Sequence, residues 1–143
     1  ELHTPETHLV PSLLLSLLGK RPVLEVYGTD YPTPDGTAIR DYIHVSDLAE
    51  AHVLALQAIL DGRAAGAVNL GTNRGYSVLE VIRTAEKVTG RQVPYLAKPR
   101  REGDPAVLLA SRTKAERELG WKPRLSEIET IIRTAWNWHQ RPA

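Results

Sequence analysis

The sequence contains no cysteine and no methionine. The absence of cysteine excludes disulfide bonds, thiolate metal ligands and thiol catalysis, and it makes the cytoplasm the default expectation for the location of the protein. A complete translation product normally starts with methionine, whereas this sequence starts with Glu1-Leu2-His3. We therefore expect the chain to be part of a longer one.

The sequence also lacks a strong excess of charge and a long apolar run. Its net charge of +1 gives no electrostatic case for binding nucleic acid or an anionic membrane. The longest apolar stretch, residues 10–18, contains Pro11 and two serines, so we do not expect it to span a bilayer. No signal peptide is expected, and the five histidines lack the spacing of a metal site. The length of 143 residues fits a single domain over 1–143.

Hydrophobic periodicity predicts helices alternating irregularly with strands. Helices are expected over residues 7–18, 46–60, 77–90, 111–120 and 126–136, and strands over residues 23–27, 39–45, 66–70 and 93–97. Ser46, Ser77 and Ser126 are the expected N-caps, and the last two have a glutamate at capping-box spacing. This pattern predicts a mixed α/β fold with a small sheet flanked by helices.

Two blocks combine arginine with a hydrogen-bonding partner: Arg40-Asp41-Tyr42-Ile43-His44-Val45 and Arg100-Arg101-Glu102-Gly103-Asp104. A guanidinium group presents a rigid fork of donors that suits a diphosphate, and an ionised aspartate accepts hydrogen bonds from sugar hydroxyls. The blocks therefore favour a pocket for a nucleoside diphosphate. The alternatives are a surface ion pair for Arg40, a solvated dibasic loop at Arg100-Arg101 and a turn at Asp104, which precedes proline.

Two histidines and the three tryptophans are expected to have structural roles. His44 and His52 are expected to act as hydrogen-bonding groups within the fold rather than as ligands. Trp121, Trp136 and Trp138 are expected to pack in the core and against helices rather than to form a platform for bases.

Residues 35–52 resemble the signature of UDP-glucose 4-epimerase, an extended short-chain dehydrogenase. Residues 68–72, 99–105 and 114–123 resemble later blocks of the same family, in the same order. The resemblance covers nearly the whole chain but only the C-terminal half of the family. It implies the substrate-binding portion of such an enzyme, with the Rossmann half absent.

The resemblance also implies roles for nine residues around a UDP-sugar. Arg40 and Arg101 would contact the phosphates, Asp104 the ribose hydroxyls, and Tyr42 the wall of the same pocket. Four residues would lie near the base or the phosphates, and one would influence whether an N-acetyl group fits: Val26, Tyr27, His8 and Leu9, and then Leu108.

The sequence lacks the family's catalytic Tyr-x-x-x-Lys and its Gly-x-Gly-x-x-Gly turn. The resemblance therefore implies that NAD and the catalytic tyrosine belong to the absent half, and we expect this chain alone to be inactive. The expected partners are a UDP-sugar and the N-terminal Rossmann half of the same polypeptide. Apolar surface left exposed by the absent half would favour self-association.

Three alternatives remain open on the sequence. The chain could be a free-standing nucleotide-sugar-binding module, or a folded piece whose pocket needs walls from the absent half. It could also be the same half of another extended short-chain dehydrogenase, such as a UDP-pentose or UDP-uronate 4-epimerase or a sugar-nucleotide dehydratase.

Overall fold

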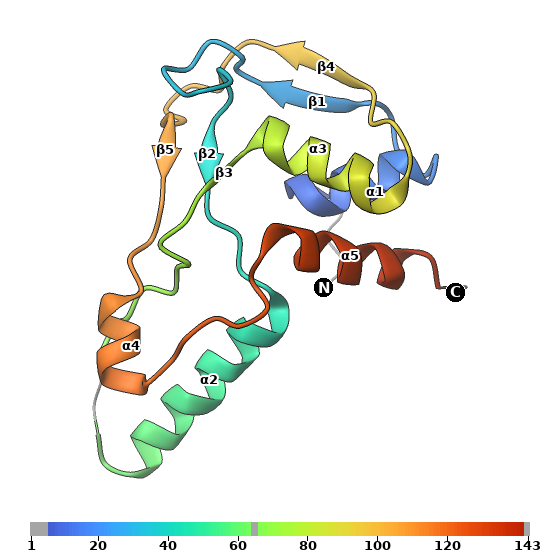
Figure 1. Ribbon diagram of the computed structural model, residues 1–143. Helices are drawn as coiled ribbons and strands as arrows, with labels where there is room; N and C mark the ends of the chain where they lie inside the picture. Colours follow the sequence, from blue (N-terminus) through green and yellow to red (C-terminus); the bar gives the residue numbers. More distant parts are fainter. Residues whose placement is uncertain (1–5, 64–65, 142–143) are drawn as a thin grey trace.

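The computed structural model describes residues 6–63 and 66–141 (Figure 1). The expected domain of residues 1–143 thus includes residues 1–5, 64–65 and 142–143, which lie outside the described part. The helices are α1 (Leu9–Leu17), α2 (Val45–Leu60), α3 (Val78–Thr89), α4 (Thr113–Leu119) and α5 (Ile128–His139). The strands are β1 (Leu24–Tyr27), β2 (Ile39–Arg40), β3 (Tyr76–Ser77), β4 (Tyr95–Lys98) and β5 (Val107–Leu108).

The strands form two small sheets. β1 pairs with β4 in parallel, with Leu24 opposite Tyr95. In the second sheet β2 lies in the middle, antiparallel to β3 and parallel to β5. The predicted mixed α/β class is confirmed.

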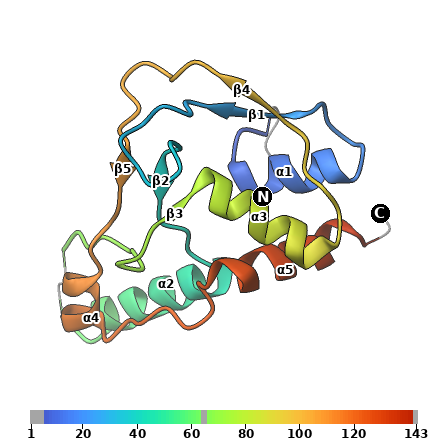
Figure 2. The same ribbon diagram turned by 45° about the horizontal axis from the view of Figure 1, so that its top comes forward.

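The larger core lies between the β1–β4 pair and the helices α1, α3 and α5, as both views show (Figures 1 and 2). Leu13, Leu14, Val81 and Ile132 supply fully buried side chains. The start of α3 is fixed locally, because the side chain of Ser77 accepts from the backbone N–H of the third helical residue in the predicted capping box. We refer to this part of the molecule as the main body.

A second, smaller cluster joins α2 to α4, which lie side by side at the other end of the molecule (Figure 1). Its buried residues are Ala51, Ala58, Ala115, Leu119 and Trp121. We refer to this part as the α2–α4 lobe. Trp121 is fully buried, and its Nε1 donates to the carbonyl of Asp47 at 2.8 Å.

The chain segments that adjoin β2, β3 and β5 connect the main body to the lobe, and we refer to them as the neck (Figure 1). Two glycines allow these segments to approach. A Cβ atom at Gly71 would lie 1.9 Å from the carbonyl oxygen of Ala110, and one at Gly75 would lie 2.4 Å from Ile39 Cγ2. A side chain at Gly71 would therefore collide with the backbone of the neighbouring segment, and one at Gly75 would displace the side chains packed against it.

The boundaries of α2 and α5 differ from those predicted. The strand expected over residues 39–45 has only two residues, because β3 and β5 pair with Ile39 and Arg40 alone, and α2 already begins at Val45. His44, not Ser46, is the N-cap, and its Nδ1 accepts from the backbone N–H of Ser46 at 3.0 Å. Ser126 is not an N-cap either, because its hydroxyl donates to Asp47 and α5 begins after Glu127.

Two further predictions are wrong. Residues 66–70, all described, form no strand, since the short β3-β2-β5 sheet does not extend to them. Trp138 is 65% exposed and is not a core residue, whereas Trp121 and Trp136 are buried as expected. The structural role of His44 is confirmed, because its Nε2 lies 2.9 Å from the hydroxyl of Thr134.

Candidate functional site

A cavity of about 550 Å³ lies beside β1, between the start of α1 and the loop that follows β4. Two residues of each arginine block line it: Arg40 and Tyr42 from the first block, and Arg101 and Asp104 from the second. Strand β1, which precedes both blocks in the chain, also lines it. Its lining residues are Glu6, Thr7, Leu9, Ser12, residues 21–27, Ala38, Arg40, Tyr42, Val78, Arg101 and Asp104.

One side of the cavity follows β1. All residues from Arg21 to Tyr27 line it. Within the described residues β1 pairs along one edge only, with β4, and this leaves backbone N–H and C=O groups on its other edge available to a ligand. Such an edge can recognise a planar polar group by paired hydrogen bonds.

Arg40 and Asp104 meet across the cavity although they are far apart in sequence. Arg40 Nη2 donates to the Asp104 carboxylate and to the carbonyl oxygen of Pro105, the latter at 2.8 Å. Arg40 lies on β2, whereas Asp104 ends a turn in which its N–H donates to the carbonyl of Arg101. Both side chains are partly buried, so their charges are less screened than those of surface pairs.

The neighbouring arginines Arg100 and Arg101 point to different places. The Arg101 guanidinium lies 4.0 Å from the centre of the Tyr27 ring, and both residues line the cavity. Arg100 lies outside the lining and pairs with Asp30 at 2.8 Å, over the ring of Tyr31. The fold thus directs only the second arginine of the dibasic pair into the cavity.

Tyr42 adds a neutral donor to the wall beside Arg40. Burial raises the pKa of Tyr42 to about 12, an effect that the nearby charge of Arg40 opposes and that of Asp41 reinforces. Its hydroxyl therefore stays protonated at neutral pH and can donate a hydrogen bond to an anionic ligand.

Most of the residues assigned to a site from the sequence lie together in this cavity. They are Leu9, Val26, Tyr27, Arg40, Tyr42, Arg101 and Asp104. His8 and Leu108 lie outside its lining. His8 has its Nδ1 2.7 Å from Glu6, and Leu108 is 58% exposed on β5.

Several polar residues of the cavity are not among the site residues predicted from the sequence: Glu6, Thr7, Ser12, Arg21 and Glu25. Arg21 donates to the hydroxyl of Ser12 at 2.7 Å, and Glu25 accepts from the hydroxyl of Tyr27 at 2.5 Å. None of the five lies in a motif, and the only available signal was the basic pair Lys20-Arg21 before the strand.

The described residues contain no group of histidines and acidic residues that could hold a metal ion, and His3 lies outside them. Among the same residues, no helix has both the length and the apolar character needed to cross a bilayer.

Comparisons with known proteins agree on one relationship. The profile of the GDP-mannose 4,6 dehydratase family matches residues 6–134. A UDP-glucose 4-epimerase of Lacticaseibacillus casei is 52% identical over 140 residues, which are 98% of this chain and 42% of that protein. The chain thus spans less than half the length of this curated relative.

Two solved structures show the same proportion. A UDP-glucose 4-epimerase from Brucella ovis in complex with NAD superposes with a TM-score of 0.91 at 50% identity, over 96% of this chain and 42% of that one. A UDP-glucose 4-epimerase from Bifidobacterium longum in complex with NAD+ and UDP gives a TM-score of 0.81 at 44% identity, over 92% of this chain and 39% of that one.

Proposed function

The chain belongs to the GDP-mannose 4,6 dehydratase family and matches the C-terminal half of an extended short-chain dehydrogenase, and from this premise we propose that it is the UDP-sugar-binding portion of a UDP-glucose 4-epimerase. The observation that carries the proposal is the convergence of Arg40, Arg101 and Asp104 on one cavity along the open edge of β1. The chain matches only 42% of the length of its relative, which supports the proposal that the remaining part of such an enzyme performs the other tasks of the reaction.

Each part of UDP has a matching group in the cavity. The guanidinium groups of Arg40 and Arg101 suit the two phosphates, and the Tyr42 hydroxyl can add a third donor. The carboxylate of Asp104 suits the ribose hydroxyls. The backbone edge of β1 next to Val26 and Tyr27 suits the carbonyl and N–H groups of uracil.

Binding would exchange partners within the cavity. In the ligand-free protein the charge of Arg40 is compensated by Asp104. A phosphate oxygen that replaces Asp104 at Arg40 frees this carboxylate to accept from a ribose hydroxyl. Since both charges keep a partner, the exchange avoids leaving an unpaired charge in a partly buried site.

NAD does not fit the residues of this chain, because the sequence has neither the Gly-x-Gly-x-x-Gly turn nor the Tyr-x-x-x-Lys pair. We assign NAD binding and the hydride chemistry to the part of the relatives that this chain does not span. The chain's own contribution is to hold the nucleotide, so that binding energy is gained far from the reacting sugar carbon.

The outer face of α2 is the proposed contact with that other part. Val53, Leu56, Ile59 and Leu60 are each more than half exposed on this helix. An apolar surface of this kind is typical of an interface. The same surface accounts for the self-association that we expect of the chain alone.

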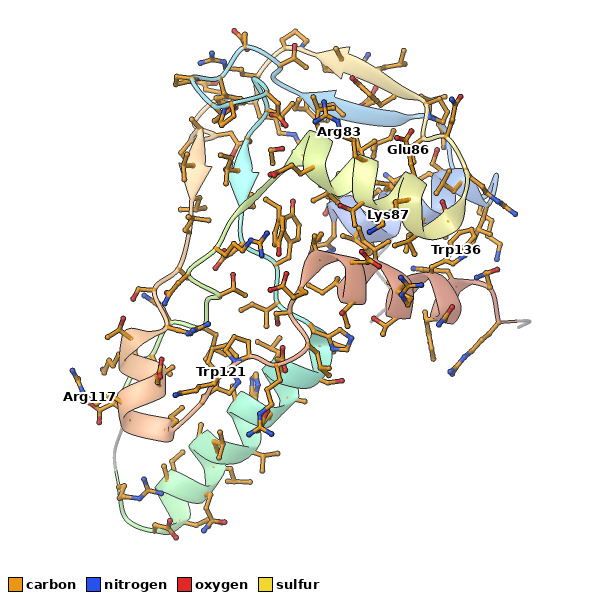
Figure 3. All side chains as sticks on the ribbon, in the orientation of Figure 1. Arg83, Glu86, Lys87, Arg117, Trp121 and Trp136 are labelled. Carbon is orange, nitrogen blue, oxygen red and sulfur yellow. The ribbon has the colours of Figure 1, made fainter. Side chains whose placement is uncertain are left out.

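The proposal is tested by calorimetric titration of the chain with UDP. We expect saturable binding, and we expect Arg101→Ala to weaken it by about 1.5–3 kcal/mol, or tenfold and more in affinity, through the loss of a charge-assisted phosphate contact. Arg117→Ala is the matched control, because Arg117 is an exposed residue of α4 that pairs with Glu118 and points away from the fold (Figure 3).

Titration with GDP distinguishes UDP recognition from the recognition of any nucleoside diphosphate. Tighter binding of UDP supports the role of the β1 edge, because guanine presents a different pattern of donors and acceptors. Absence of UDP binding, or equal binding by the Arg101→Ala variant, contradicts the proposal.

A further inference from the structure

A second cavity, of about 130 Å³, shares no lining residue with the first. Three arginines line it, and each comes from a different segment: Arg74 precedes β3, Arg112 precedes α4, and Arg124 lies between α4 and α5. The other lining residues are Thr72, Tyr76, Pro123, Ser126 and Glu127.

Glu127 is the only acidic residue of this lining, and it is already engaged. Its Oε2 accepts from Arg74 Nη1 at 3.2 Å and from the hydroxyl of Tyr76 at 2.9 Å. The Arg74 guanidinium also lies 4.8 Å from the centre of the Tyr76 ring. Glu127 therefore compensates Arg74, and no second acidic side chain lines the cavity.

Arg112 is held in place but incompletely compensated. Its Nη1 donates to the carbonyl of Thr72 at 3.1 Å. Its Nε is buried and has no hydrogen-bond partner, and among the described residues no other buried side-chain nitrogen or oxygen lacks one. The nearest carboxylate oxygen, from Glu116, is 3.7 Å from Nε, and Glu116 also binds Lys122 at 2.9 Å. Arg112 thus lies within ion-pair distance of a carboxylate that also binds Lys122, but its buried Nε donor lacks an acceptor, and such an unmade hydrogen bond is costly.

Arg124 supplies the third positive charge. Its side chain is exposed, and none of the hydrogen bonds or ion pairs among the described residues involves its guanidinium group. Its backbone is fixed, because its N–H donates to Asp47 Oδ1 at 3.0 Å. The positive end of the α5 dipole begins next to the cavity, at Ile128, and adds to the field.

We propose that this second cavity binds a phosphate group. Three guanidinium groups reach it from three separate segments, an arrangement that suits a tetrahedral oxyanion better than a planar carboxylate. Its volume of about 130 Å³ is large enough for a phosphate group. The phosphate is either the free ion or the end group of a monoester.

The proposal is tested by NMR titration of the 15N-labelled chain with inorganic phosphate and, separately, with methyl phosphate, at constant ionic strength set by chloride. We expect saturable shifts of the amides of residues 72–76 and 124–127. Arg124→Ala should weaken binding about tenfold, since one charge-assisted contact is lost. Arg117→Ala should leave the affinity unchanged.

Each outcome decides the proposal. Saturation that weakens in Arg124→Ala supports it, and the ligand with the higher affinity identifies the free ion or the monoester as the source. Shifts that rise linearly without saturation, or equal affinity in Arg124→Ala, overturn it. Arg112→Lys provides a second variant, which keeps the charge, loses the planar fork and should also bind more weakly.

The test is independent of the proposed UDP site. Arg124→Ala should bind UDP in the first cavity with unchanged affinity, and Arg101→Ala should keep the phosphate-dependent shifts of residues 72–76. Loss of UDP binding in the parent chain would contradict the proposed function and leave the phosphate result standing.

Discussion

The main body and the α2–α4 lobe bury their apolar side chains in opposite ways. In the main body Leu13, Leu14 and Ile132 are at most 1% exposed. In the lobe the buried residues of α2 and α4 are mostly alanines, while Leu56 and Leu60 on α2 are 57% and 72% exposed. Figure 3 marks the two clusters by Trp136 in the main body and Trp121 in the lobe.

The difference shows that apolar content does not by itself produce a core. α2 is rich in leucine, isoleucine and valine, yet its fully buried apolar residues are alanines, and of its larger apolar side chains Leu54 packs against the cluster while most others face solvent. The core of the main body consists mainly of large apolar side chains from α1, α3 and α5, whereas the buried cluster of the lobe consists mostly of small side chains packed around Trp121. Three changes test this comparison, in order of decreasing effect.

Trp121→Ala should have the largest effect, because it removes the only large aromatic side chain of the lobe's buried cluster in the described residues. We expect a loss of about 3–5 kcal/mol in the free energy of unfolding. Trp138→Ala, at a 65% exposed position, should change it by less than about 0.5 kcal/mol. Urea denaturation measures both.

Hydrogen exchange of the same variant then locates the damage. Amides of α2 should lose protection first in Trp121→Ala, while those of α3 and α5 stay protected. Uniform loss of protection would mean that the lobe and the main body unfold as one unit.

Asp47→Asn should have the next largest effect, at about 1–3 kcal/mol. The buried Asp47 carboxylate accepts from the N–H groups of Arg124 and Leu125 and from the hydroxyl of Ser126, and so ties α2 to the chain after α4. An asparagine can replace only one of its two acceptor oxygens.

The pH dependence of stability provides a separate measurement on Asp47. Burial acts to raise the pKa of Asp47, but the hydrogen bonds from Ser126 and from the Arg124 and Leu125 N–H groups outweigh it and hold the pKa below its ordinary value. The carboxylate therefore stabilises the fold fully above the unfolded-state pKa of about 3.9, and this contribution is lost as the pH falls through the lower folded-state pKa. Asp47→Asn should remove this part of the acid-side slope.

The double substitution Leu56→Lys and Leu60→Lys should have the smallest effect on stability, within about 0.5 kcal/mol, because both side chains are exposed. It should instead reduce self-association, which sedimentation velocity measures. Leu14→Ala in the main body is the contrasting change and should cost about 2–5 kcal/mol. A large loss of stability in the α2 double variant would show that its outer face already contributes to the fold.

Features encoded by neighbouring residues were predictable from the sequence. The capping box of Ser77 and Glu80 fixes the start of α3 by contacts three residues apart, and the sequence revealed it. Arg40, Arg101 and Asp104 of the first cavity were also predictable, because the two sequence blocks and the family resemblance both point to them.

Features that depend on distant partners could not be predicted. Asp47 lies in the first turn of α2, where an acidic residue complements the helix dipole, but its carboxylate also bonds to residues more than seventy positions away. For the same reason the local pattern predicts an N-cap at Ser126 that does not form, and a strand over residues 66–70 that the sheet does not include. Arg100 and Arg101 differ in their partners, Asp30 and Tyr27, and no local pattern in the sequence pairs either residue with its partner.

The glycines of the neck limit how this sequence can vary. At Gly62 and Gly90 the backbone has a positive φ and the surrounding space is open, so asparagine is a workable substitute. At Gly71 the obstacle is the Ala110 carbonyl itself, and no rotamer or neighbouring adjustment of a side chain can make room for a Cβ. At this crossing the backbone leaves room for glycine alone, so any other residue at position 71 would force apart two segments that lead to the lobe.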